Sequence, residues 1–94
     1  MEFNFEQVHN YYERLVFEEV ARRSQLHTDF SADMLADVAC VALNRMTPHY
    51  IRHSADLAFF TTEKERQSVR RNIDESVDFA FGYVQARHVM AARR

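Results

Sequence analysis

The chain has 94 residues and a formal net charge of −2, with twelve lysine and arginine residues against fourteen aspartate and glutamate residues. A chain of this length forms one domain, residues 1–94, and its slightly acidic balance provides no basic field for nonspecific binding, so we do not expect DNA as a partner. A single cysteine excludes an internal disulfide, and the apolar runs are far shorter than the ~20 residues of a membrane span, so we expect a cytoplasmic protein without membrane contact.

The first predicted helix runs from about Phe5 to Arg23. Asn4 precedes it as a credible N-cap, and Gln7 has the spacing to complete a capping box. Apolar residues recur at three- and four-residue steps and define one face, which we expect in the core. That face consists of Phe5, Val8, Tyr12, Leu15, Val16 and Val20.

The second predicted helix begins after Ser31, a good N-cap residue, and runs to about Met46. Thr47 and Pro48 end it, because the residue before a proline is driven out of the helical region. Cys40 lies in the middle of this helix, and we expect it to be a buried, unreactive thiol. The residues expected to face inward are Met34 or Leu35, Val38, Val41 or Ala42, and Met46.

The predicted structure of residues 50–60 is irregular, and both a short strand and a helical turn fit the sequence there. Thr62 and Glu65 then have the spacing of a capping box and begin a third helix, which runs to about Met90. Gly82 weakens this helix by roughly 1 kcal/mol relative to alanine, which is acceptable if a neighbouring helix needs the space. Its inward face consists of Val69, Ile73, Val77, Ala80 and Val84. The predicted fold is therefore all-α with three main helices and, as an open alternative, a short strand near 50–60.

A polar cluster follows the second helix, around the only proline. It consists of Asn44, Arg45, His49, Tyr50, Arg52 and His53. Guanidinium groups bind phosphate bidentately and flat side chains stack on bases, so the cluster predicts an anion site. Structural alternatives stay open: Arg45 would interact with the C-terminal end of the helix, and Asn44 would bond to the backbone of the turn. His49 and His53 are four residues apart but lack a third ligand, so we expect no metal.

A second positive patch lies at the start of the third helix, where the helix dipole favours anions. Arg66, Arg70 and Arg71 belong to it, together with Lys64. Acidic residues interleave with these cations, and an i,i+4 pair between Arg70 and Asp74 would make the patch an ordinary ion-paired surface. Contact with a phosphate and ion pairing therefore both remain open.

Two strings of the sequence resemble the late-competence ComFB family of small bacterial proteins. They are N-Y-Y-E-R-L-V-F-E-E-V, from Asn10, and A-D-V-A-C-V-A-L-N-R-M-T-P-H-Y-I-R-H, which ends at His53. The resemblance implies a receptor for a cyclic dinucleotide, cyclic di-GMP in particular. Some members carry a cysteine cluster for zinc, which this chain lacks because Cys40 is its only cysteine. The residues that we assign to ligand binding are Asn44, Arg45, Tyr50, Arg52, His53, Arg66 and Arg70.

The sequence therefore predicts a homodimeric receptor that binds a cyclic dinucleotide and signals through an unidentified downstream protein. We expect a dimer because eight phenylalanine and four tyrosine residues provide more aromatic surface than three helices cover. The alternative is a helical adaptor that needs no ligand and serves competence, motility or biofilm control. We expect neither an enzyme nor a cofactor, since nucleophile motifs and glycine-rich phosphate loops are absent from the sequence.

Overall fold

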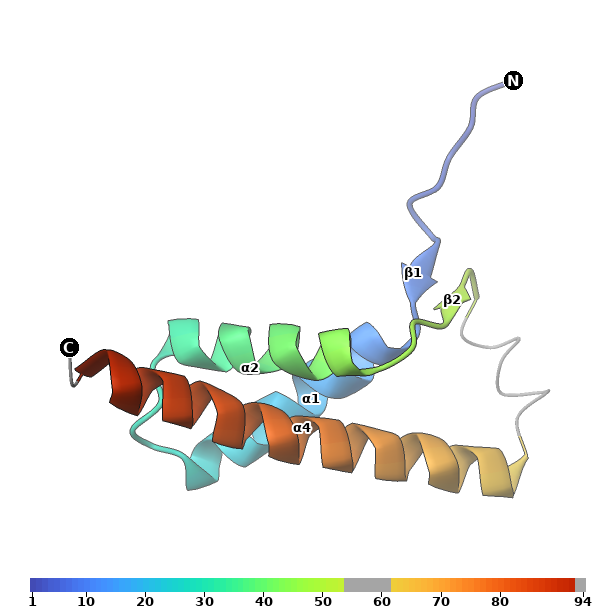
Figure 1. The fold of residues 1–94 in the computed structure, drawn as a ribbon. Coiled ribbons are helices and arrows are strands. Elements are labelled where there is room, and N and C mark those ends of the chain that lie inside the picture. The colour runs from blue at the N-terminus through green and yellow to red at the C-terminus, as the bar shows by residue number, and fades with distance from the viewer. Residues whose placement is uncertain (54–61, 93–94) are drawn as a thin grey trace.

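Three helices and one small antiparallel sheet make up the part of the chain that the computed structural model describes, residues 1–53 and 62–92. The elements are, in order, β1 (His9–Asn10), α1 (Tyr12–Arg23), the 3₁₀ turn η1 (Ser24–Leu26), α2 (Ala32–Arg45), β2 (Tyr50–Ile51) and α4 (Glu63–Ala92). Figure 1 shows that α2 runs antiparallel to both α1 and α4. The predicted all-α class with three main helices is confirmed, and the short strand that the sequence left open is β2.

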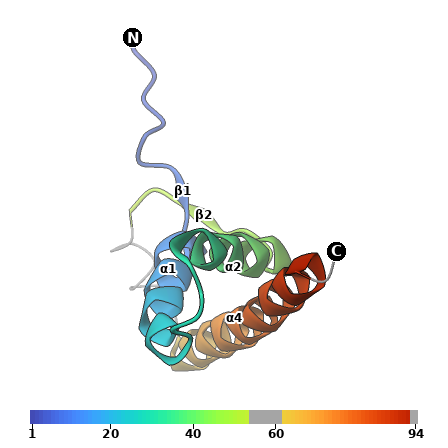
Figure 2. The ribbon, with the colours of Figure 1, turned by 90° about the vertical axis from the view of Figure 1, so that its left-hand side faces the viewer.

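The core lies between the three helices, which surround it in the end-on view (Figure 2). Its largest fully buried side chains are Val16 of α1, Val38 of α2, and Ile73 and Val77 of α4. Burial of side chains of this size stabilises a fold by roughly 1.5–3 kcal/mol each. The remaining buried apolar residues are Val20, Phe30, Ala39, Ala42, Met46, Ala80, Phe81 and Val84. Most of the predicted inward faces of α2 and α4 are thereby confirmed.

The first helix begins at Tyr12 and not at Phe5, so its predicted start was wrong. The backbone before Tyr12 is used by a short ladder, in which His9 pairs with Ile51 and Asn10 with Tyr50. The buried side chain of Asn10 holds this junction, because its Oδ1 accepts hydrogen bonds from the backbone N–H groups of Tyr12 (3.3 Å) and His49 (3.0 Å). The longer helix was predicted from helical periodicity, which gives no sign of a hydrogen bond between residues 39 positions apart.

The residues before β1 form an arm that projects away from the helices (Figure 1). Phe5 and Val8 were predicted to be core residues, but they are exposed, as is Phe3. Asn4, the predicted N-cap, instead accepts a hydrogen bond from the backbone N–H of Glu6 within the arm (2.9 Å). The apolar face of α1 is consequently shorter than predicted.

The second helix matches its predicted bounds. The Ser31 hydroxyl oxygen accepts a hydrogen bond from the Met34 backbone N–H (3.1 Å), as an N-cap does. Met46 after the helix has an extended backbone, with φ −101° and ψ 143°. Cys40 is exposed, so the prediction of a buried thiol was wrong.

The long third helix, α4, begins with the predicted capping box. The Glu65 backbone N–H donates to the Thr62 hydroxyl oxygen (3.1 Å), and the Thr62 backbone N–H donates to the Glu65 carboxylate (3.3 Å). The 30 residues of α4 extend about 45 Å at 1.5 Å per residue. A Cβ atom added to Gly82 would meet nothing within 4 Å. The space that this glycine was expected to leave for a neighbouring helix is therefore not used within the described chain.

Candidate functional site

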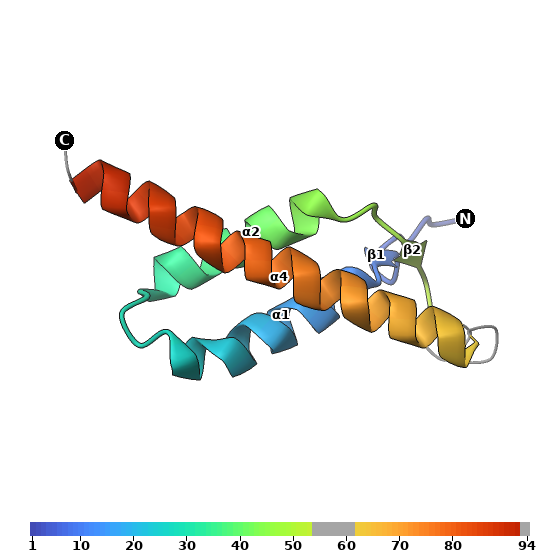
Figure 3. The same cartoon turned by 60° about the horizontal axis from the view of Figure 1, so that its bottom comes forward.

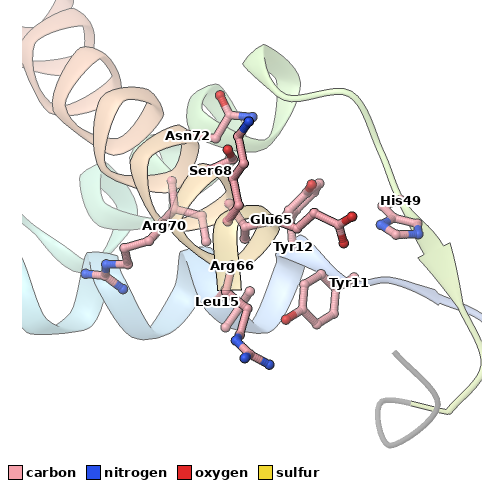
Figure 4. A pocket seen from close by; sticks show the side chains of 12 residues that line it. Tyr11, Tyr12, Leu15, His49, Glu65, Arg66, Ser68, Arg70 and Asn72 are labelled. Carbon is pink, nitrogen blue, oxygen red and sulfur yellow. The ribbon is translucent and has the colours of Figure 1, made fainter. Parts of the chain in front are cut away.

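A cavity of about 740 Å³ opens where the start of α1, the turn before β2 and the first turns of α4 meet (Figure 4). Tyr11 and Tyr12 line it from the start of α1, and His49 lines it from the turn. The first turns of α4 contribute charged, polar and apolar side chains to the third wall. That wall consists of the cations Lys64, Arg66 and Arg70, the carboxylate Glu65, the polar residues Ser68 and Asn72, and the apolar residues Val69 and Ile73.

The aromatic wall is held by the backbone of the β1–β2 junction. The ring centroid of Tyr11 lies 5.7 Å from that of Tyr12 and 6.2 Å from that of His49. The backbone of His49 is held on both sides of its Cα atom: its N–H donates to Asn10 Oδ1, and its carbonyl accepts from the Tyr11 N–H (2.7 Å). Three flat side chains are thus positioned together by main-chain bonds and not by their own packing alone.

The cationic wall comes from the N-terminal turns of α4, where the helix dipole adds partial positive charge. The Arg66 guanidinium pairs with Glu63 (3.1 Å), and its side chain is still about half exposed. Arg70 pairs with Asp74 (3.2 Å), which confirms the predicted i,i+4 pair, and also with Glu19 of α1. Both carboxylates meet the same Nη2 atom of Arg70, so further N–H donors of this guanidinium are available to a ligand.

Glu19 links this wall to the rest of α1. Its carboxylate is 2% exposed and accepts hydrogen bonds from Arg22, Arg23 and Arg70. Burial raises the pKa of the carboxyl, but the three guanidinium groups outweigh this effect and lower the pKa from 4.5 to about 2. Arg23 extends the network to Asp78 of α4. The position of Arg70 in the cavity is therefore fixed by a buried charge.

The predicted ligand-binding residues fall into two groups. Arg66 and Arg70 line the cavity, whereas the other five lie outside its lining. Asn44 and Arg45 are exposed at the C-terminal end of α2, and the Arg45 guanidinium carbon lies 3.9 Å from the centroid of the Phe79 ring on α4. Tyr50, Arg52 and His53 are exposed on and after β2. They directly follow His49, a residue of the cavity wall, but they do not line the cavity themselves.

Tyr11 and His49 line the cavity but were not assigned to ligand binding, although His49 belongs to the polar cluster that predicted an anion site. Both lie within the two strings that carry the family resemblance, which was the available signal. Their proximity depends on the pairing of β1 with β2, and neither strand is long enough to be recognised from alternation. Tyr12, predicted as core, is half-buried and belongs both to the core edge and to the cavity.

A second hollow, a groove of about 600 Å³, lies between α1 and α2. Its lining is almost entirely apolar and includes Phe17 and Val20 from α1 and Leu35, Cys40 and Leu43 from α2. Phe17 is 52% exposed, which is high for a phenylalanine on a packed helix. This groove lacks the cations of the first cavity and suits apolar contacts.

Residues 1–53 and 62–92 contain neither a metal-binding cluster nor a membrane-spanning helix. No three histidine, cysteine, aspartate or glutamate side chains gather there in a way that could hold a metal ion. None of the helices in that part of the chain is both long and apolar enough to cross a membrane.

The chain matches one protein family over most of its length. The family model described as late competence development protein ComFB matches residues 9–88. The match begins at β1 and leaves out the N-terminal arm, and it includes every residue of the cavity wall. No curated protein and no solved structure matches the chain.

Proposed function

Because the chain belongs to the late competence development protein ComFB family, we propose that it is a receptor for a cyclic dinucleotide, with cyclic di-GMP as the first candidate. In this proposal it acts as a homodimer and passes the signal on by contact with another protein. The observation that carries the proposal is the cavity, whose lining combines three aromatic rings with three cations and one carboxylate, Glu65.

The size and chemistry of the cavity suit such a ligand. Its volume of about 740 Å³ lies within the roughly 300–1,000 Å³ of small-molecule sites. Cyclic dinucleotides present two phosphates and two purine bases, so a receptor needs guanidinium groups for the phosphates and flat side chains for the bases. Arg66 and Arg70 supply the first, and Tyr11 and His49 supply the second.

The residues after the cavity extend this proposal. Tyr50, Arg52 and His53 directly follow His49, and their exposed side chains would contact the part of the ligand that projects from the cavity. Arg45 is engaged with Phe79 on another side of α4, so its contact with the ligand would require a different side-chain position. We therefore rank Arg66 and Arg70 before Arg45 as phosphate ligands.

Calorimetric titration with cyclic di-GMP, cyclic di-AMP and GTP tests the proposal. One cyclic dinucleotide is expected to bind with micromolar or tighter affinity. Arg66→Ala is expected to weaken it by about 1.5–3 kcal/mol, the range for a hydrogen bond to a charged group. Tyr11→Ala is expected to weaken the same ligand by about 1–3 kcal/mol through lost base stacking.

Arg14→Ala is the matched control for Arg66→Ala. Arg14 is an exposed arginine that pairs with Glu18 one turn away, as Arg66 pairs with Glu63, but it does not line the cavity. Its replacement is expected to leave the affinity unchanged. Absence of heat with all three nucleotides, or equal loss of affinity in Arg14→Ala and Arg66→Ala, would contradict a receptor site in this cavity.

The groove between α1 and α2 favours a second candidate, a helical adaptor that needs no ligand. Its apolar lining and the exposed ring of Phe17 provide a surface for a protein partner in competence, motility or biofilm control. An adaptor would tolerate the replacement of Arg66 by a neutral residue, and it would lose its partner when Phe17 is replaced by a polar one. The two candidates therefore respond to different substitutions.

A further inference from the structure

α4 carries a second apolar stripe that is separate from the one in the core. Phe79, Tyr83, Ala86 and Met90 follow one another at steps of four, three and four residues, so they lie along one side of the helix. All four are exposed, Phe79 by 43%, Tyr83 by 45% and Met90 by 69%. The end of α4 also runs past the other two helices (Figure 3), and every residue from 85 to 92 is exposed.

Gly82 lies beside this stripe, and its presence has no explanation inside the described chain. A glycine weakens a helix relative to alanine, and a Cβ atom at this position would meet nothing within 4 Å. A small residue on a helix surface lets another backbone approach closely. Gly82 and Ala86 are the small residues beside the large rings of Phe79 and Tyr83, which stack at 5.9 Å between centroids.

We propose that this stripe is the contact between two copies of the chain, whose α4 helices pack antiparallel across a two-fold axis. The stripe is self-complementary in this arrangement. Tyr83 of each copy lies over the partner's Ala86, and Phe79 lies against the partner's Met90, a favourable pairing of an aromatic ring with sulfur. Val89 of the partner fills the space at Gly82. Large side chains thus face small or flexible ones in every layer, which a parallel arrangement would not give, because it would place Tyr83 against Tyr83.

The charges along α4 favour the same direction. Glu75 lies one turn before Phe79 on the same side of α4, whereas Asp74 and Asp78 pair with Arg23 of α1. Residues 79–92 contain Arg87 and His88 and no acidic residue. Antiparallel packing brings the acidic end of each stripe toward the basic end of the partner, and parallel packing would bring like charges together. The positions inside the stripe are uncharged. The Arg45 guanidinium, which lies over the Phe79 ring, stays at the solvent-facing rim of the contact in this arrangement.

The area of the stripe indicates how strong this contact is. The exposed fractions of Phe79, Tyr83, Val89 and Met90 correspond to roughly 400 Å² from each copy, given about 150–250 Å² for a fully exposed aromatic side chain. A total near 800 Å² is below the roughly 1,200–2,000 Å² of stable complexes. The dimer is therefore expected to dissociate on dilution.

This inference rests on the homodimer of the proposed function, and it does not depend on the ligand. Sedimentation equilibrium over a concentration series, without nucleotide, tests it. Ala86→Glu and Ala86→Lys each place like charges near the two-fold axis and are expected to raise the dissociation constant roughly tenfold or more. An equimolar mixture of the two variants is expected to restore the dimer, because opposite charges then meet.

Gln85→Glu is the matched control. It adds the same charge at an exposed neighbouring position on another side of α4, and it is expected to leave dimerisation unchanged. Circular dichroism of each variant verifies that α4 is folded. The proposal is overturned if the wild-type protein stays monomeric at every concentration, if Ala86→Glu dimerises like the wild type, or if the mixture fails to associate. Absence of nucleotide binding by a dimer that behaves as expected would instead contradict the receptor and leave this contact intact.

Discussion

The two halves of α4 meet the rest of the protein in different ways. Residues 63–78 are rich in charge, and Glu63, Arg70, Asp74 and Asp78 all find partners of opposite charge within the chain. Residues 79–92 still contribute to the core through Ala80, Phe81 and Val84, but their other side is aromatic, aliphatic and exposed. The difference teaches that several charged side chains of the first half are paired within the chain, whereas the apolar surface of the second half is left exposed. In our proposals, the first half contributes to an anionic-ligand site and the second half contacts another copy of the chain.

Removal of the buried Glu19 carboxylate is expected to have the largest effect, because it disrupts the ion pairs between α1 and the first half of α4. Glu19→Gln is expected to lower the free energy of unfolding by about 3 kcal/mol, because Arg23 would lose the charge that stabilises it within a largely buried site. Urea denaturation monitored by circular dichroism measures this change. Glu18→Gln, which removes an exposed partner of Arg14, is the control and is expected to cost less than about 1 kcal/mol. Equal effects of the two substitutions would contradict a structural role for the buried network.

Acid should weaken the same network without any substitution. The pKa of Glu19 is lowered from 4.5 to about 2 in the folded protein, so the carboxylate contributes stability that is fully present above about pH 4.5. That stability, of up to about 3 kcal/mol, is lost as the pH falls from 4.5 toward 2, because the unfolded chain binds the proton more tightly. Unfolding curves between pH 6 and pH 2 measure this loss. The slope should be smaller in Glu19→Gln, and an unchanged slope would exclude Glu19 as its source.

The smallest expected effect lies in the second half of α4. Gly82→Ala should raise the stability of the monomer by about 1 kcal/mol, since alanine favours the helix and the added Cβ meets nothing within 4 Å. Thermal unfolding should measure this gain in stability in the Ala86→Glu variant, which is expected to be monomeric. Destabilisation of that monomer by Gly82→Ala would mean that the glycine is needed within the chain itself, and the contrast between the two halves would be weaker.

Local signals predicted the parts of the fold that depend on neighbours in sequence. Ser31, Thr62 and Glu65 marked the starts of α2 and α4, because a capping side chain bonds to a backbone group three residues away. The start of α1 was missed since Asn10 bonds to His49 across 39 residues. Helical periodicity continued through Phe5 and Val8 and could not reveal that the backbone after them pairs with β2.

The candidate site shows the same limit. Arg66 and Arg70 were recognised as part of a positive patch, because both lie near the N-terminal end of one helix, where the helix dipole favours anions. Their meeting with Tyr11 and His49 depends on the packing of α1 against α4 and on the β1–β2 ladder. The burial of Glu19 was also beyond the sequence, since one of its three guanidinium partners, Arg70, is 51 residues away. The sequence predicted which types of side chain the site contains, but it did not predict that they come together in space.

The cavity has walls from three separate segments, residues 11–15, residue 49 and residues 64–73, and this arrangement links occupancy to folding. No single segment contains the binding surface, so a molecule that fits the cavity binds the native chain and not the unfolded one. Any such molecule must raise the melting temperature, and at a concentration one hundred times its dissociation constant it adds about 2.7 kcal/mol to the free energy of unfolding. Heating the protein in the presence of candidate compounds therefore gives a search for its natural ligand that requires no knowledge of the pathway in which it acts.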